Sequence, residues 1–221
     1  MTKNPENFVQ QEVLNGGEFL IKDSSPQDIF IPEELNEEQL MIKEMCLDFL
    51  NNEVVPNIEK IEKREDNIAE TLLERMGGLG LLGSHMPETY GGMELDTNTN
   101  TLICDVMGPS GSFSTTYAAH TGIGMLPILY FGTEEQKKKY LPGLITGELK
   151  ASYCLTEPAS GSDALAAKTK AILSEDGKHY ILNGQKMWIS NAGFADVFIV
   201  FARIEDDKNL TAFIVERDWE G

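Results

Sequence analysis

The spacing of apolar residues changes near Lys150, and this change constrains the fold more than any other feature of the chain. Before it, apolar residues recur at intervals of three and four, which is the period of an amphipathic helix. After it, β-branched and aromatic residues stand in short runs with a two-residue period, which is typical of strands. The sequence therefore predicts helices followed by a β segment, an α+β architecture with more than one domain.

Two pairs of polar residues mark predicted helix starts. Asn36 with Gln39, and Thr133 with Gln136, match the capping box, in which two side chains three residues apart satisfy each other's backbone N–H groups. The second helix is expected to be short, so that the run Lys137–Lys139 lies near its end, where positive charge suits the helix dipole.

The clearest periodic segments of the helical part lie at residues 41–50, 68–76 and 102–107. Gly77-Gly78 is expected to end the second of these segments, because glycine commonly follows the last turn of a helix. A weakly polar stretch at 113–130 is expected to be buried on most of its sides. The chain is thus predicted to be helical up to about Gly147.

Short β-type runs occupy the rest of the chain, at residues 151–156, 180–182, 187–190, 197–203 and 211–215. The dipeptides Asp176-Gly177 and Asn183-Gly184 tolerate the positive φ angles of tight hairpin turns, so the strands beside them are expected to be antiparallel neighbours. No Gly-x-Gly-x-x-Gly run follows a predicted strand, which argues against a Rossmann sheet. The prediction is an antiparallel β domain, similar to a barrel or a sandwich.

Three segments follow from these patterns. Residues 1–35 contain glycine, serine and proline with only a brief apolar alternation, and are expected to form an N-terminal arm. Residues 36–148 are predicted to form an all-α helical domain, and residues 149–221 a middle β domain that is incomplete. No stretch approaches the roughly 20 apolar residues that a membrane span needs. We therefore expect a soluble, cytoplasmic protein without a membrane span.

Charge and cysteine content exclude several classes of site. The chain has 18 Lys and Arg against 36 Asp and Glu, a formal charge of −18, and lacks a basic run that could neutralise a phosphate backbone. Nucleic acid is thus not expected as a partner. Cys46, Cys104 and Cys154 are odd in number and far apart, and the histidines share no ligand spacing. Neither a disulfide framework nor a metal site is predicted.

A polar loop leaves the first predicted strand. Residues 156–163, Thr-Glu-Pro-Ala-Ser-Gly-Ser-Asp, carry hydroxyls and a glycine, as loops that hold anions or heterocycles often do. A surface connection in which Ser and Asp satisfy their own backbone has the same composition and is more common. Composition leaves both interpretations open. Glu157, next to Pro158, is expected to form a structural ion pair and not to act as a base.

The segment Cys154–Asp163 resembles, residue for residue, the signature segment of the acyl-CoA dehydrogenase family. A second stretch at 182–191, Leu-Asn-Gly-Gln-Lys-Met-Trp-Ile-Ser-Asn, follows at the family's spacing, and residues 131–137 precede the first as in family members. The resemblance covers residues 35–221, and its motifs are most similar to those of the very-long-chain branch. It implies a helical N-terminal domain, a β middle domain and a C-terminal helical domain that is absent from this chain.

The resemblance also implies a binding wall for FAD, formed by Tyr153, Cys154, Leu155, Thr156, Gly161, Ser162, Trp188, Ile189 and Ser190. The Thr156 hydroxyl would meet the polar part of the flavin ring, where hydrogen bonds stabilise the reduced form. Trp188 would pack against the ring, although in an alternating strand it would otherwise be interpreted as a core aromatic. Ser190, where the family often has threonine, would reach the N5 atom, and Ser162 would also touch the substrate.

The implied reaction is the FAD-dependent α,β-dehydrogenation of an acyl-CoA thioester to the trans-2-enoyl-CoA, with electron-transfer flavoprotein as the electron acceptor. The family's carboxylate base belongs to the C-terminal helical domain. No catalytic residue is therefore assigned in this chain, which is expected to be inactive alone. The complete enzyme is expected to be a homodimer or homotetramer. Alternatives on the same fold are an acyl-CoA oxidase, a nitroalkane oxidase or a flavin monooxygenase, and a non-catalytic binding fragment is a further one.

Overall fold

The computed structural model describes residues 14, 17–25 and 28–220, and it divides into two units, residues 1–41 and 42–221. The structure therefore describes only part of the predicted arm, and the opening polar sequence lies outside the described residues. The first unit contains the 3₁₀ turns Glu18–Leu20 and Pro32–Glu34 and the start of helix α1 (Glu37–Phe49).

The capping box predicted at the start of α1 is confirmed. The Gln39 N–H donates to Asn36 Oδ1 at 2.8 Å, and the Asn36 N–H donates to Gln39 Oε1 at 3.1 Å. Each side chain thereby satisfies a backbone donor that the first helical turn leaves unpaired.

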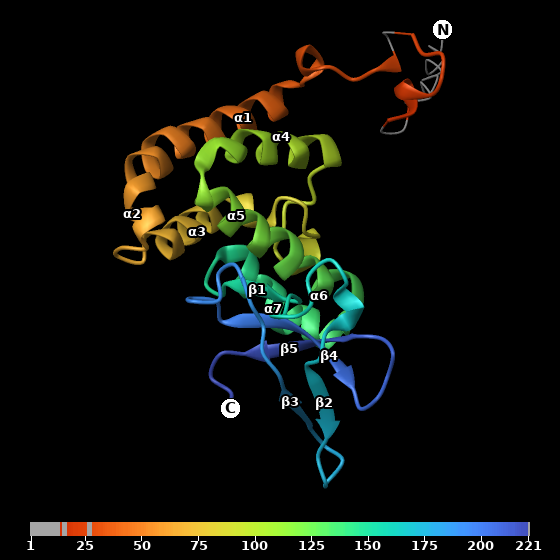
Figure 1. The fold of residues 1–221 in the computed structure, drawn as a ribbon. Coiled ribbons are helices and arrows are strands. Elements are labelled where there is room, and N and C mark those ends of the chain that lie inside the picture. Colours follow the sequence, from red (N-terminus) through yellow and green to blue (C-terminus); the bar gives the residue numbers. More distant parts are fainter. Residues whose placement is uncertain (1–13, 15–16, 26–27, 221) are drawn as a thin grey trace, which may run out of the picture. The chain divides into compact units, whose positions relative to one another are not determined.

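Helices fill the second unit as far as Thr146 (Figure 1). They are the rest of α1, α2 (Ile58–Lys63), α3 (Ile68–Gly78), α4 (Thr97–Met107), α5 (Ser112–Ala118), α6 (Leu126–Phe131) and α7 (Glu134–Thr146). Turns of π-helix lie at Leu50–Val54 and Ala119–Gly124, and 3₁₀ turns lie at Val55–Asn57, Leu81–Gly83, Glu88–Tyr90, Gly108–Ser110 and Ala164–Ala166. The predicted helical character of this part of the chain is confirmed.

The periodic apolar residues form one core of this unit. Leu72, Leu73 and Met76 of α3 are fully buried and cluster with Ile103 of α4 and Phe113 of α5. Burying a side chain of this size stabilises the fold by about 1.5–3 kcal/mol, so these positions, more than local helix propensity, hold the helices together.

Helix α7 corrects one expectation. Its capping box is present, with the Thr133 hydroxyl accepting from the Gln136 N–H, but the helix continues through Pro142 to Thr146. Lys137–Lys139 therefore lie in its first half and not at its end. The helix stops only at Gly147, whose φ of 76° few other residues adopt without strain.

The β segment forms a five-stranded sheet made of β1 (Ala151–Cys154), β2 (Lys170–Leu173), β3 (Tyr180–Asn183), β4 (Val197–Ile204) and β5 (Thr211–Glu216). The strand order is β1-β4-β2-β3, and β5 also pairs with β4. Strands β2 and β3, and β4 and β5, are antiparallel, but β4 runs parallel to β1 and to β2. The sheet is thus mixed, and the prediction of a purely antiparallel domain is wrong.

Hairpin signals account for this error. Asp176-Gly177 does lie in the β2–β3 turn, where Gly177 has a φ of 68°. Asn183-Gly184 ends β3 without forming a hairpin, and the chain crosses to β4 through a long irregular segment. Only such a long connection lets a later strand return in parallel. The strand expected at 187–190 is absent from this segment.

Buried His120 joins the helices to the sheet. Its Nδ1 accepts from the Ala151 N–H at 3.1 Å, so its Nε2 carries the proton and donates to the Leu144 carbonyl at 2.9 Å. Burial lowers the pKa of His120 to about 4, an effect that the Leu144 carbonyl opposes and the nearby Lys150 charge reinforces. The ring is therefore neutral at pH 7.

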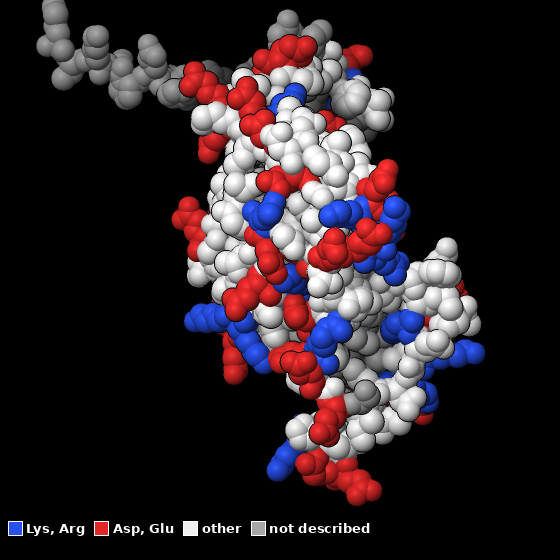
Figure 2. All heavy atoms as spheres, turned by 90° about the vertical axis from the view of Figure 1, so that its left-hand side faces the viewer, with Lys and Arg blue, Asp and Glu red and all other residues white. Residues whose placement is uncertain are grey.

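None of the helices in the described part of the chain is both long and apolar enough to cross a bilayer. On the face drawn in Figure 2, Lys and Arg side chains are interspersed with Asp and Glu.

Two neighbouring glycines at the end of α3 give a test of the packing. A Cβ on Gly77 would overlap the Thr146 carbonyl, whereas a Cβ on Gly78 would meet open space. We expect Gly77→Ala to lower the free energy of unfolding by about 1–3 kcal/mol through overpacking. Gly78→Ala should leave it unchanged or raise it by up to about 1 kcal/mol, because alanine favours helix. Urea unfolding measures both, and equal effects would contradict the close approach.

His120 predicts a pH dependence. Its folded-state pKa of about 4 lies below its usual value of 6.5, so the folded protein favours the neutral ring. The resulting stability is fully present above pH 6.5 and is lost as the pH falls towards 4. We expect the unfolding free energy of His120→Gln to fall less steeply over this range. Burial also lowers the pKa of His85, which both proteins share, so the difference between their slopes reports His120 alone. Identical slopes would show that it contributes nothing.

Candidate functional site

The two segments that resemble the family lie side by side. The Met187 N–H donates to the Thr156 carbonyl at 2.9 Å, and the Ser152 hydroxyl donates to the Ser190 carbonyl at 2.9 Å. These bonds align residues 186–191 with β1 and the loop that follows it. The structure therefore brings the predicted positions 153–156 and 188–190 together to form one wall.

Trp188 is the most unusual residue of this wall. Its side chain is 85% exposed, and its backbone has a φ of 59°, which is an outlier for a bulky residue. A core aromatic would be buried, so the interpretation of Trp188 as a core residue is wrong. Such strain, of about 1–3 kcal/mol, persists where the surrounding structure enforces it, and it clusters at ligand sites.

The wall also presents free hydroxyl groups. Neither the Thr156 nor the Ser190 hydroxyl makes a hydrogen bond to another described residue. Tyr153 is half-buried, with its ring 4.9 Å from the Phe201 ring, and Cys154 is buried. Burial raises the pKa of the Cys154 thiol to about 11, so this thiol stays protonated. The wall thus offers an aromatic ring and neutral donors.

Gly161 and Ser162 occupy the exposed tip of the next loop. The turn just before this loop, residues 157–160, is closed by a pair of bonds, from the Glu157 N–H to the Ser160 carbonyl at 2.9 Å and from the Ser160 N–H to the Glu157 carbonyl at 3.1 Å. The Ser160 hydroxyl spans the loop itself by donating to the Asp163 carbonyl at 2.8 Å. A Cβ on Gly161 would meet open space. The tip is therefore accessible, and it makes no hydrogen bond to residues 186–191.

Glu157 and Lys186 form a buried ion pair beneath the wall. Their side chains are 6% and 11% exposed, and the Lys186 ammonium lies 2.8 Å from Glu157 Oε1. The carboxylate also accepts the Lys168 N–H at 2.6 Å and the Thr169 N–H at 3.0 Å. Burial raises the pKa of Glu157, but these hydrogen bonds and Lys186 outweigh it and lower the pKa to about 2. The expected structural ion pair is confirmed, and such a group is a poor base at neutral pH.

An apolar cavity of about 400 Å³ opens beside the wall. Met107 of α4, Tyr117 and Ala118 of α5 and Ile123 line it, and Ser190 stands at its edge. Its lining suits an uncharged aliphatic group better than a polar one.

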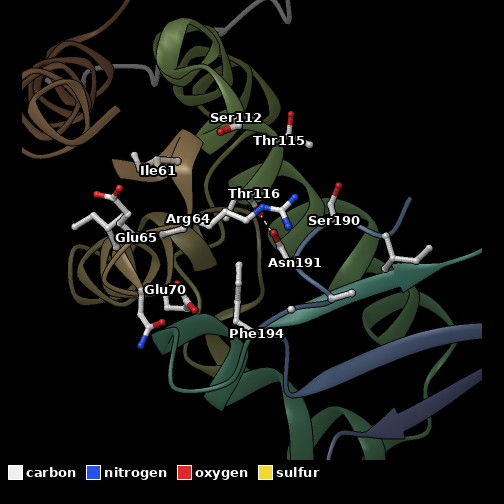
Figure 3. Close-up of a pocket in the computed structure, with 16 residues that line it drawn as sticks. Ile61, Arg64, Glu65, Glu70, Ser112, Thr115, Thr116, Ser190, Asn191 and Phe194 are labelled. Atoms are coloured by element: carbon white, nitrogen blue, oxygen red, sulfur yellow. Dashed lines mark hydrogen bonds between the residues drawn. The ribbon is translucent and has the colours of Figure 1, made fainter. Parts of the chain in front are cut away.

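A second cavity, of about 450 Å³, is also lined by Ser190 (Figure 3). It is bounded by the turn before α3, by the start of α5 and by residues 189–194. Arg64 extends over it, and Glu65 and Glu70 line it as well, so both signs of charge are present. Among the described residues, no group of three or more His, Cys, Asp or Glu could hold a metal ion.

Comparison with known proteins gives the family. Residues 36–148 match the description "Acyl-CoA dehydrogenase, N-terminal domain", and residues 152–221 match "Acyl-CoA dehydrogenase, middle domain". The chain belongs to the acyl-CoA dehydrogenase family. The predicted order of a helical domain followed by a sheet domain is thereby confirmed.

Individual relatives agree. A "Probable acyl-CoA dehydrogenase" of Bacillus subtilis (strain 168) is 50% identical over 210 residues, covering 95% of this chain and 35% of the relative. The "Very long-chain specific acyl-CoA dehydrogenase, mitochondrial" of Macaca fascicularis is 43% identical over 163 residues, covering 70% of this chain and 25% of the relative.

A solved structure shares the fold. The "Crystal Structure of Acyl-CoA Dehydrogenase complexed with FAD from Bacillus anthracis" superposes with a TM-score of 0.88 at 51% identity, covering 93% of this chain and 36% of that chain. The chain thus spans between about a quarter and about a third of the length of these relatives.

Some residues of the site were not predicted from the sequence. The cavity residues Met107 and Ile123 look like ordinary core positions, and no spacing marks them as neighbours of Ser190. Asn191 was part of the matching stretch but was given no role. Asparagine adopts a φ such as its 64° more readily than most residues do, but a φ angle cannot be read from the sequence.

Because the ion pair between Glu157 and Lys186 is buried, we expect substitution of Lys186 to lower the free energy of unfolding far more than substitution of an exposed lysine. Lys186→Met leaves the Glu157 carboxylate buried without its cation, so we expect the free energy of unfolding to fall by about 3 kcal/mol. Lys170→Met, which removes an exposed partner of Asp206, should change it far less. The double variant Glu157→Gln/Lys186→Met should recover part of the loss. Chemical denaturation checks this, and equal effects of the two single lysine variants would disprove it.

Proposed function

We propose that this chain forms the flavin-facing wall of an FAD-dependent enzyme that oxidises acyl-CoA thioesters to trans-2-enoyl-CoA. The observation that carries the proposal is Trp188, an exposed aromatic ring held by a strained backbone next to the free hydroxyl of Ser190. A protein gains nothing in stability from that arrangement, whereas a flat heterocyclic ligand would cover the ring.

The residues present fit a flavin. Its isoalloxazine ring is flat, with an apolar face and a polar edge, and the wall supplies an aromatic side chain and neutral hydrogen-bond donors. Trp188 would pack against the face, while Thr156 and Ser190 would donate hydrogen bonds to the edge. Backbone groups of Tyr153–Leu155 and Ile189 would complete the wall, with Gly161 and Ser162 near the outer end. When bound, FAD supplies the acceptor for the substrate hydride.

The acyl chain would occupy the apolar cavity lined by Met107, Tyr117 and Ile123. This places the aliphatic part of a substrate at the edge where Ser190 stands, which is where a hydride would have to leave. Ser162, on its exposed loop, would contact the CoA part. Its small side chain and the open space around Gly161 suit such a contact.

We infer no catalytic base among these residues. Glu157 uses Oε2 for the Lys168 N–H and Oε1 for Thr169 and Lys186, so it cannot approach a substrate. Removal of the α proton would fall to a carboxylate elsewhere in the complete enzyme. Electron-transfer flavoprotein as acceptor, assembly as a homodimer or homotetramer and a cytoplasmic location are part of the proposal. An acyl-CoA oxidase, a nitroalkane oxidase, a flavin monooxygenase or a non-catalytic binding fragment would share this wall.

The rate at which the reduced flavin reacts with oxygen distinguishes these enzymes. In a protein that contains this chain together with a base, anaerobic acyl-CoA should bleach the flavin absorbance, and air should restore it slowly if the enzyme is a dehydrogenase. Rapid oxygen consumption would identify an oxidase, and no bleaching by acyl-CoAs of any length would remove both.

FAD titration tests the wall in this chain. We expect weak binding, seen as quenching of flavin fluorescence, because a flavin would be covered from one side only. Trp188→Ala should weaken it by about tenfold, through loss of the aromatic contact. Trp219→Ala is the matched control, since Trp219 is also exposed but lies after β5. Equal affinity of the Trp188→Ala variant and the wild type would refute the proposed role.

A further inference from the structure

We propose that Asn191 is a positioning residue that fixes Trp188 and Ser190 relative to helix α5 and strand β1. The inference rests on the proposed function for the role of the wall in binding a flavin. The contacts of Asn191 that support the inference are present in the chain itself. Nothing in the residues' order along the chain requires Asn191 to reach either element.

The side-chain amide of Asn191 makes two long-range bonds. Its Nδ2 donates to the Thr116 carbonyl at 3.0 Å, drawn as a dashed line in Figure 3, and to the Ala151 carbonyl at 3.3 Å. Thr116 lies in α5 and Ala151 begins β1. One buried amide, 8% exposed, therefore ties the irregular segment to both a helix and a strand.

The choice of asparagine carries information. The backbone φ of 64° would suit glycine at least as well. Asparagine instead buries an Oδ1 that has no hydrogen-bond partner, which is unfavourable by itself. The two Nδ2 bonds offset that loss, and flipping the amide would turn an oxygen towards two carbonyl oxygens. The residue is thus suited to these two bonds rather than to the turn alone.

The two hydrogen bonds of Asn191 lie where the apolar cavity and the flavin-facing wall meet. Tyr117 and Ala118, which follow Thr116 in α5, line the apolar cavity, and Ser190 immediately precedes Asn191. A second bond, from the Ser152 hydroxyl to the Ser190 carbonyl, holds the same point from β1. Asn191 therefore sets the spacing between the cavity wall and the residues proposed to face the flavin. It touches neither flavin nor substrate, so its role is positioning.

The experiment uses tryptophan as a local probe. The chain has two tryptophans, so in a Trp219→Phe background the near-ultraviolet circular dichroism and fluorescence anisotropy report Trp188 alone. Asn191→Gly keeps the left-handed backbone and removes the amide, and Asn191→Asp keeps the shape and removes the donor. Asn67→Gly is the matched control, because Asn67 is also left-handed, with a φ of 52°, but its side chain caps nothing.

We expect both Asn191 variants to lose most of the Trp188 dichroism at a temperature where the far-ultraviolet spectrum is unchanged, and to bind FAD about tenfold more weakly. The Asn67 variant should match the wild type in both readouts. Unchanged Trp188 signals in both Asn191 variants would overturn the proposal. If either variant fails to fold, the Ser152→Ala variant, which removes the second tie, must show a smaller loss in the same direction, and no loss overturns the proposal too. Failure of FAD to bind the wild type would reject the proposed function but leave the Trp188 result interpretable.

Discussion

The buried carboxylate of Glu157 is the interaction on which the rest of the wall depends. It accepts two backbone N–H groups just before β2 and the ammonium of Lys186 at the start of the second wall segment. Lys186 in turn donates to the Leu155 carbonyl at 3.1 Å. A charge buried without these partners would cost several kcal/mol, so loop, strand and irregular segment must adopt their arrangement together. That requirement supplies the rigidity against which Trp188 can be held in an unfavourable conformation.

Sequence periodicity predicted the helices well because burial and helix formation depend on the same residues. Leu72, Leu73 and Met76 repeat at helical spacing and are also the side chains at the centre of the core. The capping boxes at Asn36 and Thr133 succeeded for a related reason, since each is a local bond between residues three apart. Lys137–Lys139 were misplaced because the helix was expected to be short, whereas α7 continues through Pro142, whose missing N–H is tolerated within it.

The sheet was harder to predict because strand pairing joins residues far apart in sequence. Nothing in Ala151–Cys154 states that its partner is β4, or that the two run parallel. Residues 187–190 failed for a more specific reason. Their aromatic and β-branched side chains are typical of a strand, but the conformation of the backbone there is set by the long-range hydrogen bonds of Lys186, Ser190 and Asn191 instead. Local preference and final conformation disagree at the point where the ligand is proposed to bind, which is where such conflicts are expected.

The neutrality of the wall explains how a strongly acidic protein can bind an anionic ligand there. With a formal charge of −18, a site that held its ligand by long-range attraction would repel an anionic thioester or dinucleotide. The buried cations near the wall are already neutralised, Lys186 by Glu157 and Lys150 by Glu74 at 2.6 Å. What faces outward is an indole ring with the hydroxyls of Thr156 and Ser190, whose interactions act only at contact distance and are insensitive to the surrounding field. Recognition by shape and short-range hydrogen bonds demands that the groups be held in place before the ligand arrives, because each loosely held group must be ordered on binding. A neutral wall therefore has to be rigid to bind at all. That rigidity is provided together by the strained backbone of Trp188, the buried amide of Asn191 and the ion pair beneath them.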